Sequence, residues 1–131
     1  MRGVLAATVP LAMMTTACLY LGPVDPVPNP IISPPSFPFV KPNSPNVVLA
    51  NNATVVTFTA IAYDANTPSS QLQYLWYLDT AQVSSGAGSA GESYSTEGAS
   101  IGTNPPNHVL QVVVSDALAL NTSHQWSITV Q

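Results

Sequence analysis

Charged side chains are scarce in this sequence. Only 6% of its 131 residues are Asp, Glu, Lys or Arg, where an ordinary globular domain carries about a quarter. Arg2 and Lys41 are the only basic residues against six acidic ones, and the formal net charge is −4 at pH 7. A protein with no basic patch cannot neutralise the phosphates of nucleic acid, so this composition excludes nucleic acid as a partner.

Cysteine is represented once, by Cys18. A single cysteine excludes an intramolecular disulfide. An unpaired thiol outside the cytosol would be a reactive liability, which a covalent lipid on the sulfur removes. The sequence around Cys18 can therefore indicate whether the protein is exported and attached to a membrane.

The residue patterns of catalysis are also missing. Both histidines, His108 and His124, open predicted strands that run antiparallel, so we expect them at opposite ends of the domain and no shared histidine site. No G-x-S-x-G sequence occurs, and an unaccompanied serine is not an activated nucleophile. The sequence predicts no catalytic residue, no cofactor and no enzyme.

The first 18 residues have the three-part layout of an export signal. Met1 and Arg2 give a short positive start, residues 3–14 form an apolar run, and small residues at 15–17 precede Cys18. We predict a signal peptide over residues 1–17. The segment resembles the signal and lipobox of bacterial lipoproteins, although Thr15 stands where that family prefers Leu. The resemblance implies a diacylated Cys18 as the mature N-terminus and a membrane partner through this anchor.

Leu19 follows the cysteine, and the same resemblance then implies the outer membrane or cell surface. Two alternatives stay open. Cleavage by an ordinary signal peptidase would give a secreted or periplasmic soluble protein. An uncleaved anchor is the other, since residues 3–22 carry no charge and about 20 apolar residues can span a bilayer, although Pro10 disfavours it.

A proline-rich stretch follows. Residues 23–45 contain nine prolines, a composition that favours extended polyproline II backbone. We predict that residues 18–45 are a lipid-anchored linker. The alternative is a docking site for proline-binding modules, because Pro35 and Pro38 frame a P-x-x-P.

From residue 46 onward the hydrophobic residues alternate with period two, which is typical of strands. The clearest alternating segments are residues 54–63, 72–78, 108–116 and 124–131, with turn formers at 64–70, 84–91, 102–107 and 117–123. Residues 46–50 are predicted as a first strand and 93–101 as one or two weaker ones. The inward set is predicted to include Phe58, Tyr74, Trp76, Leu110, Val112, Trp126 and Ile128. Short alternating strands without a helical stretch predict an all-β fold, a single antiparallel sandwich over residues 46–131.

Three motifs carry a resemblance for the domain: YLWYLD at residues 74–79, LQVVVSD at 110–116 and WSITV at 126–130. They resemble strands C, F and G of bacterial immunoglobulin-like (Ig-like) domains related to the PKD family. The resemblance implies an Ig-like β-sandwich and says almost nothing about the ligand. Residues 84–107 depart from it, being longer and richer in glycine than the family pattern.

Two surface features are candidates for function. Asp64, Asn66 and Asp116 are expected at one end of the domain and are weak candidates for a calcium site, which needs six to eight oxygen ligands. The alternative is that each Asp starts a turn by accepting a backbone N–H two residues on. Leu75 and Tyr77 point outward, as an exposed patch or beneath residues 84–107.

These observations favour a cell-envelope or surface lipoprotein whose non-catalytic Ig-like module binds a protein or surface partner or gives structural support. One rival is a subunit of a secreted or surface assembly that packs through strand edges. Another is a calcium-dependent adhesion module.

Overall fold

The computed structural model describes residues 32–131 of the chain. These residues form eight strands, one four-residue helix and two 3₁₀ turns. The elements are β1 (Ser36–Lys41), β2 (Asn46–Leu49), β3 (Val55–Tyr63), η1 (Ser69–Gln71), β4 (Gln73–Leu78), β5 (Ala81–Ala87), η2 (Gly88–Ala90), β6 (Ser93–Glu97), α1 (Gly98–Ile101), β7 (Asn107–Ser115) and β8 (Asn121–Val130).

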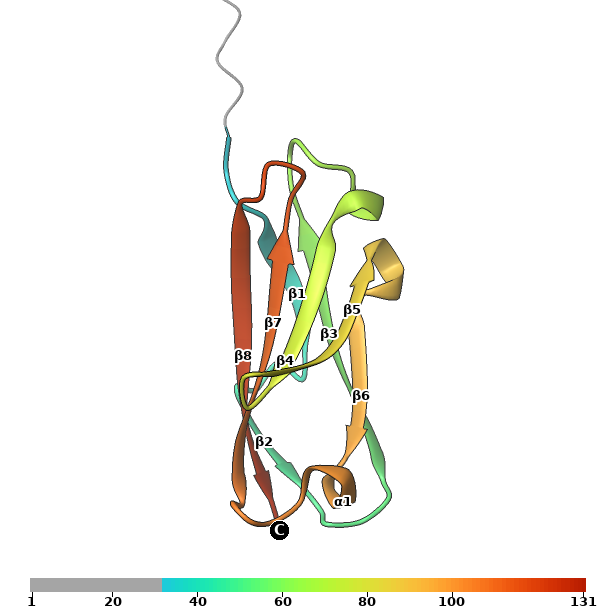
Figure 1. The fold of residues 1–131 in the computed structure, drawn as a ribbon, viewed down its shortest axis with the longest axis vertical. Helices are drawn as coiled ribbons and strands as arrows, with labels where there is room; N and C mark the ends of the chain where they lie inside the picture. Colours follow the sequence, from blue (N-terminus) through green and yellow to red (C-terminus); the bar gives the residue numbers. More distant parts are fainter. Residues whose placement is uncertain (1–31) are drawn as a thin grey trace, which may run out of the picture. The chain divides into compact units, whose positions relative to one another are not determined.

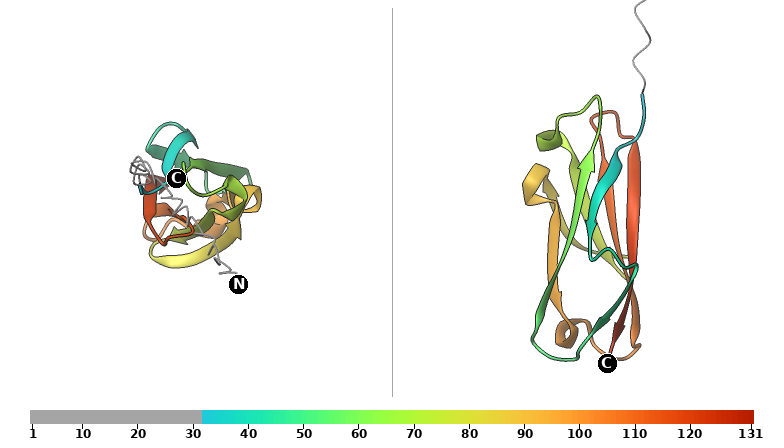
Figure 2. Two further views of the ribbon diagram at one scale, coloured as in Figure 1. Left: turned by 90° about the horizontal axis from the view of Figure 1, so that it is seen from above. Right: turned by 180° about the vertical axis from the view of Figure 1, so that it is seen from behind.

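The strands form two sheets that face each other (Figure 1). The smaller sheet has the order β1-β3-β6 and the larger has the order β2-β8-β7-β4-β5. The view from behind brings the smaller sheet to the front (Figure 2, right). Every pair is antiparallel except β2 and β8, which run parallel. The predicted all-β sandwich is thus confirmed, with one parallel pair added at the edge of the larger sheet.

Period-two alternation explains why these segments are strands. On β7, His108, Leu110, Val112 and Val114 are buried and the residues between them are exposed or partly exposed. All seven residues expected inside are at most 1% exposed: Phe58, Tyr74, Trp76, Leu110, Val112, Trp126 and Ile128. Strands β3, β4, β7 and β8 therefore each present one apolar face to the opposite sheet and one mixed face to solvent.

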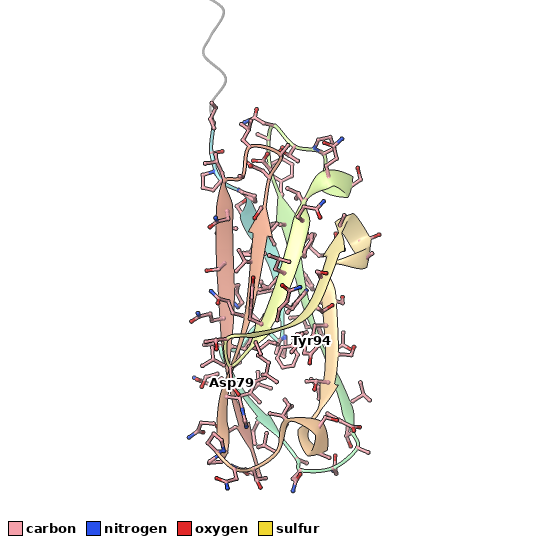
Figure 3. The ribbon with its side chains drawn as sticks, in the orientation of Figure 1. Asp79 and Tyr94 are labelled. Carbon is pink, nitrogen blue, oxygen red and sulfur yellow. The ribbon has the colours of Figure 1, made fainter. Side chains whose placement is uncertain are left out.

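Aromatic rings fill the centre of this core. The rings of Trp76 and Trp126 stack with their centroids 5.9 Å apart and their planes 10° apart. Tyr94 of β6, labelled in Figure 3, stacks on the other side of Trp76 at 5.9 Å. Each indole N–H finds a backbone acceptor, Trp76 on Gly91 O and Trp126 on Pro42 O, both at 2.8 Å. The largest side chains are thus packed and also satisfied in hydrogen bonding.

The predicted boundary at residue 46 is wrong. Ser36–Lys41, assigned to the linker, forms β1 and pairs with β3, placing Phe39 opposite Ile61 and Lys41 opposite Thr59. Pro38 is compatible with this strand because β1 is an edge strand, and its register is irregular between Ser36 and Phe39. A proline without an N–H is tolerated at such positions. The predicted signal peptide, Cys18 and the first part of the linker lie outside the described residues.

Residues 84–91, expected as a turn, are also assigned incorrectly in part. The sequence AQVSSGA at 81–87 forms β5, an edge strand that pairs with β4. Residues 93–101, expected as one or two strands, form β6 followed by the single helical turn α1. Backbones approach closely here, since a Cβ on Gly91 would lie 2.5 Å from Gly86 O. Two glycines therefore make the passage from β5 to β6 possible.

Candidate functional site

A shallow depression of about 450 Å³ opens on the outer face of the larger sheet. Tyr77, Gln111 and Gln125 form its central row, because β4 pairs Tyr77 with Gln111 and β7 pairs Gln111 with Gln125. Val109 and the turn residues Asp79 and Thr80 complete the lining. One aromatic ring, two amides, a hydroxyl and a carboxylate thus converge on one surface.

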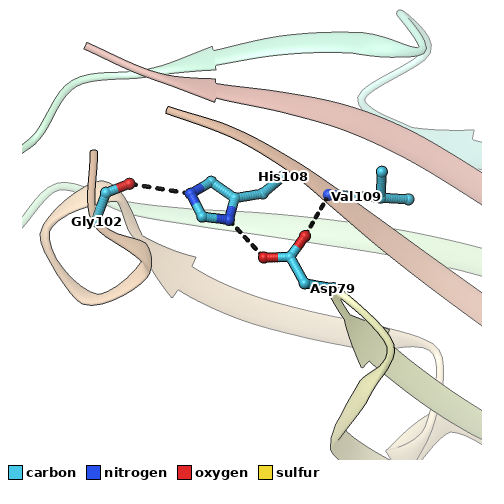
Figure 4. Close-up of polar contacts among 4 residues, drawn as sticks. All are labelled: Asp79, Gly102, His108 and Val109. Atoms are coloured by element: carbon cyan, nitrogen blue, oxygen red, sulfur yellow. Dashed lines mark hydrogen bonds and ion pairs between the residues drawn. The ribbon is translucent and has the colours of Figure 1, made fainter. Parts of the chain in front are cut away.

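The turn between β4 and β5 has an unusual backbone. Asp79 and Thr80 have φ of 48° and 73°, values that favour glycine or asparagine and are unfavourable for a β-branched residue. The chain is held there by Asp79. Its N–H donates to Val109 O at 2.9 Å, and its Oδ1 accepts the Val109 N–H at 2.9 Å. The rim of the depression is therefore tied to β7 (Figure 4).

His108 adds a second tie, as Figure 4 shows. Its Nδ1 lies 2.5 Å from Asp79 Oδ2 and its Nε2 lies 3.1 Å from Gly102 O. Asp79 Oδ2 and Gly102 O can both accept hydrogen bonds, so the protonated ring can donate to both of them from its two nitrogens. The hydrogen bond to Asp79 raises the pKa of His108 although burial opposes this. Burial acts against ionisation of Asp79, but hydrogen bonds from His108 and Val109 outweigh it and lower the pKa of the carboxyl.

This pair resembles the acid–histidine part of a catalytic triad, but it has no free nitrogen. A general base needs an unprotonated ring nitrogen directed at the reacting group. Here one nitrogen binds the carboxylate and the other binds a backbone carbonyl, and the His108 side chain is only 5% exposed. His108 is thus a structural link between the β4–β5 turn and the loop after α1.

The expected placement of the two histidines at opposite ends of the sandwich is wrong. Strand β8 begins at Asn121, three residues before the predicted start, so His124 pairs with Val112 in the middle of the sheet. His124 packs edge-on against Trp126 at 4.5 Å and faces Phe37 at 6.2 Å. Burial lowers the pKa of His124. Four residues of β7, about 13 Å, separate the partner of His124 from His108, and the two form no joint site.

The weak metal candidates act as turn residues. Asp64 Oδ2 accepts the N–H of Asn66 at 3.1 Å, and Asp116 Oδ1 accepts the N–H groups of Leu118 and Leu120, each at 2.8 Å. Their loops meet, since the Ala117 N–H donates to Thr67 Oγ1 at 3.3 Å. Among residues 32–131 no group of three or more His, Cys, Asp or Glu side chains is arranged to hold a metal ion.

The path of the chain answers the open question for Tyr77. Residues 84–107 continue β5 beside β4 and then cross to β6 in the other sheet, and Tyr77 lines the open depression. Leu75, on the same strand, is partly buried. The alternation in the sequence predicts an outward direction for Tyr77, but it gives no sign that Asp79 and Thr80 lie beside it, because this depends on the β4–β5 hairpin.

No helix in the part of the chain that the structure describes has the length and apolar character of a membrane span. Cys18, the predicted lipidation site, lies outside that part.

The architecture is that of an immunoglobulin-like β-sandwich. Fibronectin(III)-like modules of CbhA from Clostridium thermocellum have a similar fold, with a TM-score of 0.53 and 18% sequence identity over 71% of this chain and 94% of the module chain. At this identity the likeness shows the fold alone. No family model matches the sequence. No curated protein matches it either.

Proposed function

We propose that this chain is an exported lipoprotein of the cell envelope whose fibronectin type III-like sandwich serves as a non-catalytic binding module. The observation that carries the proposal is the depression formed by Tyr77, Gln111, Gln125 and the β4–β5 turn. It is held in shape by a strained turn and two side-chain ties, as expected for a preformed recognition surface. The anchor is inferred from the lipobox-like sequence before Cys18.

The fold and the use of His108 support a non-catalytic role. In a catalytic site an acid and a histidine are arranged so that the histidine can exchange protons with a substrate. Here both are engaged in holding loops together. The remaining groups of the depression are amides, a phenol and a hydroxyl, which suit recognition better than proton transfer at neutral pH.

The export proposal is tested by mass spectrometry of the mature protein purified from an expressing bacterium. The expected N-terminal residue is Cys18 carrying a diacylglycerol group. A mature chain that begins at Cys18 without lipid would support the secreted or periplasmic alternative. A chain that retains residues 1–17 would contradict the lipoprotein.

The binding proposal is tested by retention of the purified protein on isolated cell envelopes. Tyr77→Ala removes the aromatic member of the depression and is expected to lower retention at least about fivefold, as for loss of a central contact. Tyr63→Ala is the matched control, since Tyr63 is 63% exposed on β3 of the other sheet. Equal retention by both variants would contradict a role for the depression.

One observation favours a second candidate, assembly through strand edges. Strand β5 (Ala81–Ala87) lies at the edge of its sheet and contains neither a charged residue nor proline, the usual protections of such an edge. Analytical ultracentrifugation over a concentration series tests this. Assembly that Val83→Lys abolishes, while Val48→Lys on the opposite edge strand β2 leaves it unchanged, would support it. A monomer at all concentrations would exclude it.

A further inference from the structure

The proposed function does not say which class of ligand is bound. The side chains that line the depression reduce the number of ligand classes that fit. The side chains of Tyr77, Thr80, Gln111 and Gln125 make no hydrogen bond to any other group within residues 32–131, although Tyr77 and Gln111 are partly buried. On the smaller sheet, by contrast, Thr57 pairs with Ser95 at 2.7 Å. The depression therefore offers a group of unused donors and acceptors.

The charge balance of the depression favours a neutral ligand. Asp79 is the only carboxyl group in its lining, and that group is paired with His108. Lys41, the single Lys or Arg in the described residues, lies on β1 of the other sheet. A phosphate, sulfate or carboxylate ligand would have no cation to meet it, and binding of a cation would have to displace His108.

The backbone disfavours an extended peptide as the ligand. Peptides that bind to sheets usually pair with a free strand edge. The centre of the depression lies over β4 and β7, each of which is hydrogen-bonded on both sides by neighbouring strands. Strand β8 pairs with β7 along its length and with β2 at residues 127–130. Recognition over β4 and β7 therefore depends on side chains alone.

We propose that the depression is a binding site for a neutral saccharide, a deepening that rests on the proposed binding function. Sugars present hydroxyl groups that both donate and accept, and each Gln amide offers both functions in one plane. Sugar rings also carry apolar C–H faces, for which the Tyr77 ring and Val109 provide a matching surface. The volume of about 450 Å³ falls in the range of small-ligand sites.

The shape of the site predicts weak binding to a chain rather than tight capture of one sugar. The depression is open on one side, so a bound sugar keeps much of its surface in water. Neighbouring sugars of the same chain can continue over the outer face of the sheet. We expect a Kd of about 1 mM for a hexasaccharide, typical of a few hydrogen bonds and one stacked ring.

The test is an NMR titration of the protein extracted from expressing cells in a sugar-free detergent. The probes are hexasaccharides of β-1,4-linked glucose, β-1,4-linked N-acetylglucosamine and α-1,4-linked glucose, each to about 10 mM, roughly ten times the expected Kd. At least one is expected to shift the side-chain amide signals of Gln111 and Gln125 together. No shift with any of the three, or shifts confined to other surfaces, would overturn the proposal.

Variants make the test specific. The double variant Gln111→Ala with Gln125→Ala is expected to weaken binding at least about tenfold, as for loss of two hydrogen-bonding groups. Asn51→Ala is the matched control, because Asn51 is an exposed amide in the loop between β2 and β3, away from the outer face of β4 and β7. Near-UV circular dichroism verifies that each variant is folded, and equal affinities of the double variant and the control would refute the site.

The experiments distinguish a wrong saccharide assignment from a wrong proposal that the depression binds a partner. If the hexasaccharides do not bind but envelope retention still depends on Tyr77, the saccharide assignment is refuted and a protein partner takes its place. If retention is also independent of Tyr77, the proposed function fails together with it.

Discussion

At the scale of single residues, Trp76 is a fully buried member of the aromatic core. It is 0% exposed, stacks between Trp126 and Tyr94, and donates to Gly91 O. Because no disulfide joins the sheets, this stack takes the place that a cross-sheet bridge occupies in antibody domains.

We therefore predict that Trp76→Ala lowers the free energy of unfolding by about 3–5 kcal/mol, a large part of the roughly 5–15 kcal/mol expected for a domain. Trp76→Phe retains a ring but loses the N–H donor, and its effect should be smaller by at least about 1 kcal/mol. Urea unfolding measures both. A midpoint for Trp76→Ala close to that of the wild type would show that the core is not organised around this ring.

Thr80 offers the opposite kind of prediction. With φ at 73°, a β-branched residue is strained, and glycine relieves that strain at some entropic cost. Thr80→Gly is expected to raise the free energy of unfolding by about 1 kcal/mol. Thr103→Gly, in an exposed loop with ordinary backbone angles, is expected to lower it by a few tenths to about 1 kcal/mol. Thermal unfolding measures the stability of both variants. Equal changes in stability would contradict the strained backbone at Thr80.

At the scale of the elements, β1 determines where the domain starts. It covers one edge of β3, packs Phe37 and Val40 against the core, and precedes Pro42, whose carbonyl accepts the Trp126 N–H. A fragment of residues 46–131 lacks all three contributions.

We predict that this fragment is less stable than one of residues 32–131 by at least about 3 kcal/mol, from lost apolar burial and one buried donor left without its acceptor. Its tryptophan emission should also move to longer wavelength as Trp126 gains access to water. Circular dichroism melting and fluorescence of the two fragments measure this. Equal melting temperatures would mean that β1 contributes little to the fold.

The sequence allowed the central strands to be predicted but not the edges. Period-two alternation in β3, β4, β7 and β8 is strong because one face of each is buried by the opposite sheet. Strands β1 and β5 carry weaker patterns, since edge strands are exposed on more sides and tolerate Pro38 or a run such as AQVSSGA. Composition alone suggested a linker and a turn there.

The candidate site was predictable only in part, for a related reason. Alternation gave the outward direction of Tyr77. That Tyr77 lies in one row with Gln111 and Gln125 depends on the register between three strands, which distant residues determine. The tie between Asp79 and His108 spans 29 positions in the chain, and no local pattern reports it.

The loops that contain Asp64 and Asp116 allow a prediction about metal binding. Their carboxylates already accept backbone N–H groups, so we expect 10 mM calcium to leave the melting temperature unchanged. A site with a Kd of 1 mM would instead add about 1.4 kcal/mol at that concentration, a rise of roughly 6–11 °C for a domain of this size.

Asp116→Ala provides the complementary measurement. It leaves two N–H groups without their acceptor and should lower stability by about 1–3 kcal/mol in the presence or absence of calcium. A loss of stability seen only with calcium would favour the adhesion-module alternative.

At the scale of the whole molecule, the two histidines oppose each other as pH changes. In the unfolded chain both titrate near 6.5. Folding raises the pKa of His108 through Asp79 and lowers that of His124 by burial. The contribution of His108 is therefore complete below 6.5 and is lost as pH rises through its folded pKa. The contribution of neutral His124 is present above 6.5 and is lost as pH falls below that value.

The melting temperature should consequently be highest near pH 6.5 and fall on both sides of that value. His108→Gln is expected to remove the alkaline decline and to cost about 1 kcal/mol at pH 6, a modest value because the Asp79 side chain is 47% exposed. His124→Phe is expected to reduce the loss of stability at acidic pH instead. A phenyl ring beside Trp126 and Phe37 cannot be protonated, so acid does not favour the unfolded chain at this position. If the two variants retain both slopes of the wild type, other groups govern the pH dependence, and the assignment of opposite protonation states to the two rings is wrong.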